Sequence, residues 1–153
     1  MNDFLELAKE EAILAMNKGE IPVGAVIVKD GVIIGKAHNL KETLNDSTAH
    51  AEILAIKEAS RYIGNWRLNG AEMYVTLEPC PMCAGAIVNA RISKLIYGAN
   101  DKKSGASGSL YNITNDPRLN HRLEVIPNIL EDECAQLLKS FFRNKRNYSK
   151  SLR

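Results

Sequence analysis

The residues best suited to chemistry lie in two short segments, one around His50 and one around Cys80. The second segment contains two cysteines three positions apart, Cys80 and Cys83, preceded by Pro79. We expect a buried strand over residues 73–77 to end just before them and a helix to begin with them, so both thiols lie on one side of its first turn. The free amide groups and the dipole of a helix N-terminus favour anionic sulfur, which prepares both thiols to bind a metal.

Two thiolates do not complete a tetrahedral zinc shell, and the upstream segment offers the missing groups. His50 supplies an imidazole, and Glu52 stands two residues later. A shell of His50, Cys80 and Cys83 leaves one position for water, whose pKa zinc lowers towards neutrality. Glu52 is spaced to reach that water without binding the metal, so it would take the water's proton and deliver it to a leaving group. This pattern predicts one catalytic Zn²⁺ per subunit and hydrolytic attack on an sp² carbon that bears an amine.

Each of these residues also has a non-catalytic interpretation. A lone CxxC pair is as often redox-active or structural as catalytic, and a zinc module that only binds RNA or a protein would need neither Glu52 nor an open coordination position. Cys134 is in register with Leu138 on the last predicted helix, which indicates a core residue and not a fourth ligand. His38 and His121 are expected to be surface or hydrogen-bonded histidines.

Composition narrows the class of protein. The chain has 153 residues, 45% of them hydrophobic, with a net charge of +2. This suits a single globular domain over residues 1–153 with a sizeable core. Three cysteines are too few for a disulfide framework, and residues 1–6 lack the basic and then apolar pattern of a signal peptide. No apolar run is long enough to cross a bilayer. These features predict a cytoplasmic protein with no membrane partner.

Apolar periodicity, turn residues and capping residues predict the order α-β-β-α-β-α-β-β-α. Helices are expected over residues 2–18, 49–63, 80–88 and 131–147, and strands over residues 23–28, 32–37, 73–77, 94–97 and 123–126. Asp30 and Gly31 form a two-residue hairpin turn, and residues 98–120 form a long loop with one short helix. In the second helix we expect Ile53, Ile56 and Ala59 to contact the core. The order predicts an α/β fold, a three-layer α-β-α domain with a five-stranded mixed sheet and a frayed basic tail at 148–153.

The two chemical segments together carry a family resemblance. His50-Ala51-Glu52 followed by Glu78-Pro79-Cys80-Pro81-Met82-Cys83 resembles the signature of the zinc-dependent cytidine and deoxycytidylate deaminase superfamily. The likeness to its bacterial tRNA adenosine deaminase branch extends over nearly the whole chain, including residues 20–25, 37–39, 66–68, 74–78, 105–110, 120–122 and 141–143. The resemblance implies a cytidine-deaminase-like fold, a homodimer, and hydrolytic deamination of adenosine to inosine at the wobble position of a tRNA anticodon stem-loop.

The resemblance also implies which residues bind substrate. The position of Asn39 holds the flipped adenine, the backbone at Ala51 helps to orient it, and Val23 packs against it. The loop that carries Asp101 borders the anticodon bases, and the last helix touches RNA. The implied substrate-binding residues are Val23, Asn39, Ala51, Asp101, Lys103, Ser104, Gly105, Phe142, Arg143 and Arg146. Lys102 is a departure, because relatives often carry Pro or Ala there.

The terminal helix helps to choose between substrates. Residues 141–153 contain five basic residues and no acidic one, and the paired aromatics Phe141 and Phe142 beside them favour RNA contact over a merely solvated face. Trp66 is expected to pack and stays outside the predicted site. The spacing of the ligands does not distinguish adenine from cytosine or guanine. A free-base or nucleotide deaminase acting on a guanine or cytosine compound therefore remains the alternative, although it would have no use for a basic terminal helix.

Overall fold

The computed structural model describes residues 2–151, and it describes side chains as far as residue 147. The elements are α1 (Asn2–Asn17), β1 (Gly24–Lys29), β2 (Val32–His38), α2 (Ala51–Ile63), β3 (Glu72–Leu77), α3 (Pro81–Asn89), β4 (Lys94–Ala99), β5 (Glu124–Ile126) and α4 (Glu131–Ser151). This confirms the predicted order of helices and strands.

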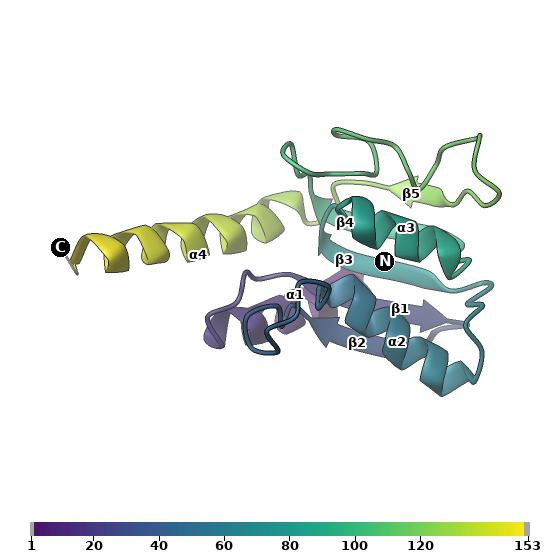
Figure 1. Ribbon diagram of the computed structural model, residues 1–153, viewed down its shortest axis with the longest axis horizontal. Helices are drawn as coiled ribbons and strands as arrows, with labels where there is room; N and C mark the ends of the chain where they lie inside the picture. The colour runs from purple at the N-terminus through teal and green to yellow at the C-terminus, as the bar shows by residue number, and fades with distance from the viewer. Residues whose placement is uncertain (1, 152–153) are drawn as a thin grey trace.

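The strands form one mixed sheet in the order β2-β1-β3-β4-β5 (Figure 1). Strand β1 is antiparallel to both β2 and β3, whereas β4 is parallel to both β3 and β5. The turn between β1 and β2 has left-handed φ angles at Asp30 (50°) and Gly31 (77°), as a two-residue hairpin turn requires. The strand directions bring the start of β1 and the ends of β2, β3 and β4 to one edge of the sheet.

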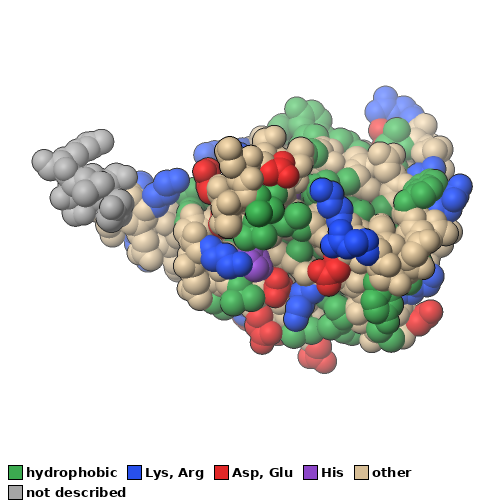
Figure 2. All heavy atoms as spheres, turned by 60° about the horizontal axis from the view of Figure 1, so that its bottom comes forward, with side chains coloured by type: hydrophobic (Ala, Val, Ile, Leu, Met, Phe, Trp, Pro, Cys, Tyr) green, Lys and Arg blue, Asp and Glu red, His purple; other side chains and the backbone are tan. Residues whose placement is uncertain are grey.

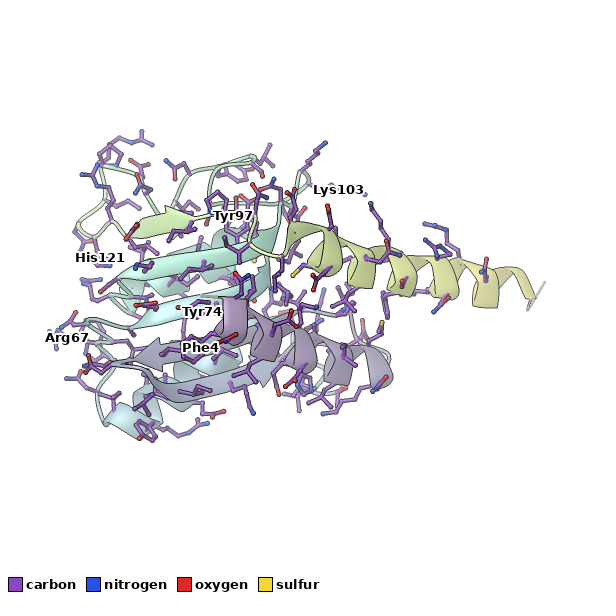
Figure 3. All side chains as sticks on the ribbon, turned by 180° about the vertical axis from the view of Figure 1, so that it is seen from behind. Phe4, Arg67, Tyr74, Tyr97, Lys103 and His121 are labelled. Atoms are coloured by element: carbon purple, nitrogen blue, oxygen red, sulfur yellow. The ribbon has the colours of Figure 1, made fainter. Side chains whose placement is uncertain are left out.

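Helices cover both faces of the sheet. Helices α2 and α3 lie on the face turned to the viewer in Figure 1, and α1 and the first turns of α4 lie on the face seen in Figure 3. Alternate strand residues point to the two sides: Ile27 and Met73 pack with α2 and α3, whereas Val26 and Tyr74 pack with α1. The Tyr74 ring lies 5.2 Å from that of Phe4 in α1, centroid to centroid (Figure 3). The three-layer α-β-α prediction and the five-stranded mixed sheet are confirmed.

Helix α2 differs from its prediction in its start and its buried side. It begins at Ala51 because His50 has an extended backbone and serves as the N-cap. Its buried residues are Ala51, Ala55 and Ala59, spaced by four positions, together with Glu52. Ile53 therefore points away from the core and is only half-buried, so its prediction as a core contact is wrong, while Ile56 packs against the core from its edge.

The loop between β4 and β5 contains turns and a single bridge, Ser107 to Asn112, and the short helix predicted in it is absent from the described residues 100–123. Its amides bond instead to nearby side chains: the Asp101 carboxylate accepts the amides of Lys103 (3.0 Å) and Ser104 (3.2 Å). Such local bonds compete with helical ones, which explains the difference.

Helix α4 projects away from the rest of the domain (Figure 1). It ends at Ser151, four residues beyond its predicted end at 147. The predicted frayed tail begins inside this helix, and its last two residues, 152–153, lie outside the described residues. Cys134, near the start of α4, is 1% exposed, as expected of a core residue. Of the helices described between residues 2 and 151, none has the length and apolarity needed to span a membrane.

Packing of α1 on the sheet gives a stability prediction. Leu5 is fully buried there, whereas Leu14 on the same helix is 46% exposed. We expect Leu5→Ala to lower the free energy of unfolding by about 2–5 kcal/mol, because it leaves a cavity between α1 and the sheet. Leu14→Ala, the matched control, should change it by no more than about 0.5 kcal/mol. Urea denaturation of both variants measures the difference, and equal losses would contradict this packing.

Candidate active site

The metal-ligand candidates occupy two helix N-termini that meet at the same edge of the sheet. His50 is the N-cap of α2 and Cys80 the N-cap of α3, with extended ψ angles of 154° and 172°. Pro81 fixes the first position of α3, and Cys83 follows in its first turn. Nδ1 of His50 lies 3.6 Å from Sγ of Cys80 and 3.5 Å from Sγ of Cys83. Cys80 and Cys83 are 30 and 33 positions from His50 in the chain, and the order of strands in this sheet brings them together.

The three ligand atoms suit a metal ion. They lie within 4.8 Å of one another, and among the described residues no other His, Cys, Asp or Glu joins the cluster. Two thiols and one imidazole form a three-ligand set of the kind found in catalytic zinc sites, where the fourth position is left for water or substrate. The donor set therefore fits zinc.

The pKa values of the two thiols are shifted in opposite directions. The pKa of Cys80 is lowered to about 4, chiefly because the Cys83 thiol donates a hydrogen bond to its sulfur and also because His50 does. The same hydrogen bond raises the pKa of Cys83, and the bond to Cys80 raises the pKa of His50. The positive ends of α2 and α3 point at these groups and favour negative charge there. A divalent cation would displace the shared protons and hold both sulfurs as thiolates.

Glu52 lies beside the cluster without belonging to it. It sits in the first turn of α2, is 4% exposed, and lines the same cavity as His50 and Cys80. Burial raises the pKa of its carboxyl to about 7. A carboxyl group in such surroundings can both accept and release a proton near neutral pH.

A cavity of about 200 Å³ opens in front of the cluster. Its lining residues are Ile21, Val23, Asn39, Lys41, His50, Ala51, Glu52, Leu77, Glu78, Cys80, Asp101 and Ser104. Cys83 is fully buried beneath it. Asn39 is held by two hydrogen bonds, since its Nδ2 donates to the Ile21 carbonyl (3.2 Å) and its Oδ1 accepts the Lys41 amide (3.1 Å). The structure thus gathers the predicted pocket residues Val23, Asn39, Ala51, Asp101 and Ser104 around the predicted ligands and Glu52.

The predicted basic residues form a second group. Lys103, Phe142, Arg143 and Arg146 line a groove of about 570 Å³ along α4, and Figure 3 shows Lys103 beside the first turns of that helix. A third hollow shares Asp101 and Ser104 with the cavity and Lys103 and Phe142 with the groove. The third hollow therefore adjoins both the cavity and the groove. On the face drawn in Figure 2, basic and acidic side chains are interspersed, so the basic groove is a local feature.

Gly105 is the one predicted substrate residue that lines neither the cavity nor the groove. It is a buried residue of the loop between β4 and β5, and an added Cβ there would lie 2.4 Å from the Glu78 carboxyl carbon. Conversely, Ile21, Lys41, Leu77 and Glu78 line the cavity and were not predicted. For Glu78 a signal existed: a charged residue stands between an apolar strand and a helix N-cap. Lys41 carried no signal beyond its place two residues after Asn39.

His38, His121 and Trp66 lie outside the cavity. His38 Nδ1 bonds Glu11 (2.9 Å) and His121 Nε2 bonds the Ile92 carbonyl (2.7 Å), so both are hydrogen-bonded histidines as expected. Trp66 is 52% exposed, and the Arg67 guanidinium carbon lies 4.3 Å from the centroid of the Trp66 ring. It is a surface residue outside the candidate site.

Comparison with known proteins identifies the family. Residues 2–146 match the model of the MafB19-like deaminases. The chain is 51% identical over 150 residues to the tRNA-specific adenosine deaminase of Bacillus subtilis, a match that covers 98% of this chain and 93% of that protein. The chain belongs to the tRNA-specific adenosine deaminases. This membership confirms the resemblance found in the sequence.

Solved structures agree with this membership. A structure from a study of A-to-I editing by tRNA A34 deaminases at the wobble position of transfer RNA superposes with a TM-score of 0.87 at 46% identity, covering 90% of this chain and all of that one. A guanine deaminase from Bacillus subtilis superposes with a TM-score of 0.63 at 34% identity, covering 95% of this chain and 92% of that one. This deaminase therefore shares its fold with a free-base deaminase, but it is more similar to the RNA-editing enzyme.

Proposed function

We propose that this deaminase converts adenosine to inosine at the wobble position of a tRNA anticodon, with one Zn²⁺ held by His50, Cys80 and Cys83. One observation carries the proposal: Glu52 lines the cavity in front of the three ligands, and a hollow that shares lining residues with both lies between this cavity and the basic groove along α4. A free-base deaminase has a use for the cavity alone, whereas an RNA substrate uses both.

The reaction consumes water and releases ammonia. Zinc, when bound, would supply a Lewis acid that lowers the pKa of a water molecule towards neutrality. Glu52 lies where it can accept the proton that this water loses on attacking C6 of adenine, and it then delivers that proton to the departing amino nitrogen. Burial raises the pKa of the Glu52 carboxyl to about 7, so near neutral pH the group can take up the proton as a carboxylate and deliver it as an acid, which returns it to the carboxylate.

Binding divides between the cavity and the groove. A base must leave its stack to reach the cavity, and an anticodon loop offers unstacked bases at low cost. Asn39, Ala51 and Val23 would hold the base, next to the wall formed by Asp101 and Ser104. Along the groove, Lys103, Arg143 and Arg146 would contact phosphates, and the 40% exposed ring of Phe142 would stack on a base.

Two further features belong to the proposal. We infer that residues 1–153 form one deaminase domain that pairs as a homodimer, because α2 and α3 leave apolar side chains such as Ile53 and Met82 partly uncovered on their outer side. Sedimentation equilibrium tests this pairing. We also infer that the protein acts in the cytoplasm, where its tRNA substrate is used.

Incubation of the zinc-loaded protein with a tRNA that carries adenosine at the wobble position tests the function. We expect inosine at that position and no conversion of free guanine or free cytidine under the same conditions. The matched control is the same tRNA with guanosine at the wobble position. Conversion of guanine or cytidine without conversion of the tRNA would contradict this proposal and favour a free-base or nucleotide deaminase.

The groove gives a salt-dependence prediction. We expect Arg143→Ala and Arg146→Ala each to weaken RNA binding and to reduce the slope of log K against log salt concentration by about 1, because each removes one phosphate contact. Arg67→Ala makes the same change of charge at the end of the domain opposite Lys103 (Figure 3). It should leave the slope unchanged. Fluorescence anisotropy with a labelled anticodon stem-loop measures all three, and equal slopes in all variants would remove the groove from the binding site.

A further inference from the structure

Glu78 is a buried carboxylate that the proposed chemistry leaves unused. It directly follows β3, is 1% exposed, and lines the cavity near Cys80 without joining the metal cluster. Its Oε1 accepts hydrogen bonds from the amide of Asp101 (3.0 Å) and the hydroxyl of Ser109. Its Oε2 accepts the amides of Ser107 and Ser109, both at 3.0 Å. A buried charge is costly unless such donors satisfy it, so the carboxylate and residues 101–109 hold each other in place.

The loop closes tightly over this carboxylate. A Cβ at Gly105 would lie 2.4 Å from the Glu78 carboxyl carbon and 2.4 Å from the Asp101 carbonyl oxygen, so only glycine permits the observed approach. The Ala106 amide also donates to the Pro79 carbonyl (2.8 Å), next to Glu78 in the chain. Glu78 and Pro79, which lie just before the N-cap of α3, therefore hold the loop by these hydrogen bonds.

The contact extends from Glu78 to the cavity wall. The Asp101 amide is bound by Glu78, and the Asp101 carboxylate in turn accepts the Ser104 amide (3.2 Å) and hydroxyl (2.9 Å). Asp101 and Ser104 both line the cavity. A displacement of the loop at Glu78 would therefore move the side chains that face the substrate.

The other side of the cavity has a similar arrangement. Glu20 is also 1% exposed, and its carboxylate accepts the amides of Glu42 (3.1 Å) and Thr43 (2.6 Å). Those residues continue the loop that carries Lys41, which lines the cavity beyond the end of β2. Because β2 and β4 lie on opposite sides of β1 and β3, the two carboxylates hold two different walls.

We propose that Glu78 is a positioning residue for the substrate: it fixes the cavity wall formed by Asp101 and Ser104 and so sets how well the RNA is bound for reaction. This inference rests on the proposed function. Glutamine cannot replace Glu78, because both oxygens accept hydrogen bonds from N–H or O–H groups and the amide –NH₂ would face a donor in either orientation.

Hydrogen exchange tests the structural half without any assay of activity. In Glu78→Gln we expect the amides of Asp101, Ser107 and Ser109 to exchange about 10–100-fold faster than in the natural protein, the range that corresponds to the loss of a charge-assisted hydrogen bond. Amides within α3 should not change. Glu20→Gln is the matched control: it should accelerate exchange at residues 42–43 and leave residues 101–109 unchanged. Unchanged exchange at residues 101–109 in Glu78→Gln would overturn the proposal.

A double-mutant cycle tests the functional half. We expect Glu78→Gln to lower kcat/KM for the anticodon stem-loop about tenfold, mainly through KM, with zinc content unchanged. In an Asp101→Ala background, Glu78→Gln should lower kcat/KM by less than a further threefold, because the Asp101 side chain that Glu78 positions is already missing. Fully additive losses, or a loss of zinc that parallels the loss of activity, would overturn the proposal.

Misfolding of the Glu78→Gln variant and inactivity of the natural protein would have different meanings. If Glu78→Gln does not fold, Ser109→Ala removes only the hydroxyl donor to Oε1, and it should give a smaller acceleration at the same amides; no acceleration there would also overturn the proposal. If the natural protein forms no inosine in tRNA, the proposed function fails at once, before any variant is compared. The exchange results still test the contact between Glu78 and the loop in that case, because they do not depend on turnover.

Discussion

Replacing Glu52 with glutamine is expected to lower kcat for tRNA deamination by about 10²–10⁴-fold while zinc content stays unchanged. Glu52 lines the cavity with His50 and Cys80 but is not one of the three clustered ligands. The glutamine amide keeps the volume of the side chain, yet it cannot accept a proton from water and pass it to the leaving nitrogen. The variant therefore removes proton transfer and leaves metal binding intact.

Single-turnover kinetics with saturating RNA, together with elemental analysis for zinc, measure both quantities. Glu58→Gln provides the control, because Glu58 lies on the same helix but is exposed to solvent. It should react at the rate of the natural protein. A Glu52→Gln variant with normal kcat would show that the proton travels by another route, and one that loses zinc would make Glu52 a ligand.

The second large effect concerns the metal ligands. We expect Cys80→Ala and His50→Ala each to weaken zinc binding by more than about 100-fold, because even the loss of an outer hydrogen-bond partner of a ligand costs roughly 10–100-fold. With two ligands left, the ion has no stable three-ligand set. Activity should be lost together with the metal, and it should not return when zinc is added at the concentration that saturates the natural protein.

Matched controls exist for both residue types. Cys134 is buried in the core and His121 is bonded to the Ile92 carbonyl, both away from the three-ligand cluster. Cys134→Ala and His121→Ala should keep their zinc. Competition with a chromogenic chelator measures the affinity of all four variants. Normal zinc affinity in Cys80→Ala or His50→Ala would remove that residue from the proposed ligand set.

Much of this protein could be predicted from sequence because the signals are local. The spacing of Cys80 and Cys83 places both at the start of one helix, and the spacing of His50 and Glu52 places the carboxyl one turn from the imidazole at most. A continuous apolar run over residues 73–77 predicted the buried strand β3, the apolar residues 23–28 predicted β1, and Asp30-Gly31 predicted the hairpin turn. Each inference needed only neighbouring residues.

The sequence-based predictions were wrong where tertiary packing selects one of two arrangements that the local sequence allows equally. Ile53 and Ala55 both fit a buried helical stripe, and the sheet accepts the side of α2 that carries alanine, since a Cβ at Gly35 in β2 would lie only 2.5 Å from the Ala55 carbonyl oxygen. The loop after β4 does not form the predicted short helix, because its backbone amides donate hydrogen bonds to the carboxylates of Asp101 and Glu78. Neither choice can be read from periodicity.

By itself, the sequence determined the kinds of element and the candidate ligands, since these follow from short-range periodicity and spacing, and its resemblance to known deaminases indicated the family. Only the tertiary structure decided that the N-termini of α2 and α3 meet, that Lys41 and Glu78 border the cavity, and that Gly105 packs against Glu78 and lines neither the cavity nor the groove. The physical reason is the order and direction of the strands, which bring the start of β1 and the ends of β2, β3 and β4 to one edge. Contacts between segments so far apart in the chain depend on that arrangement, and no local pattern encodes it.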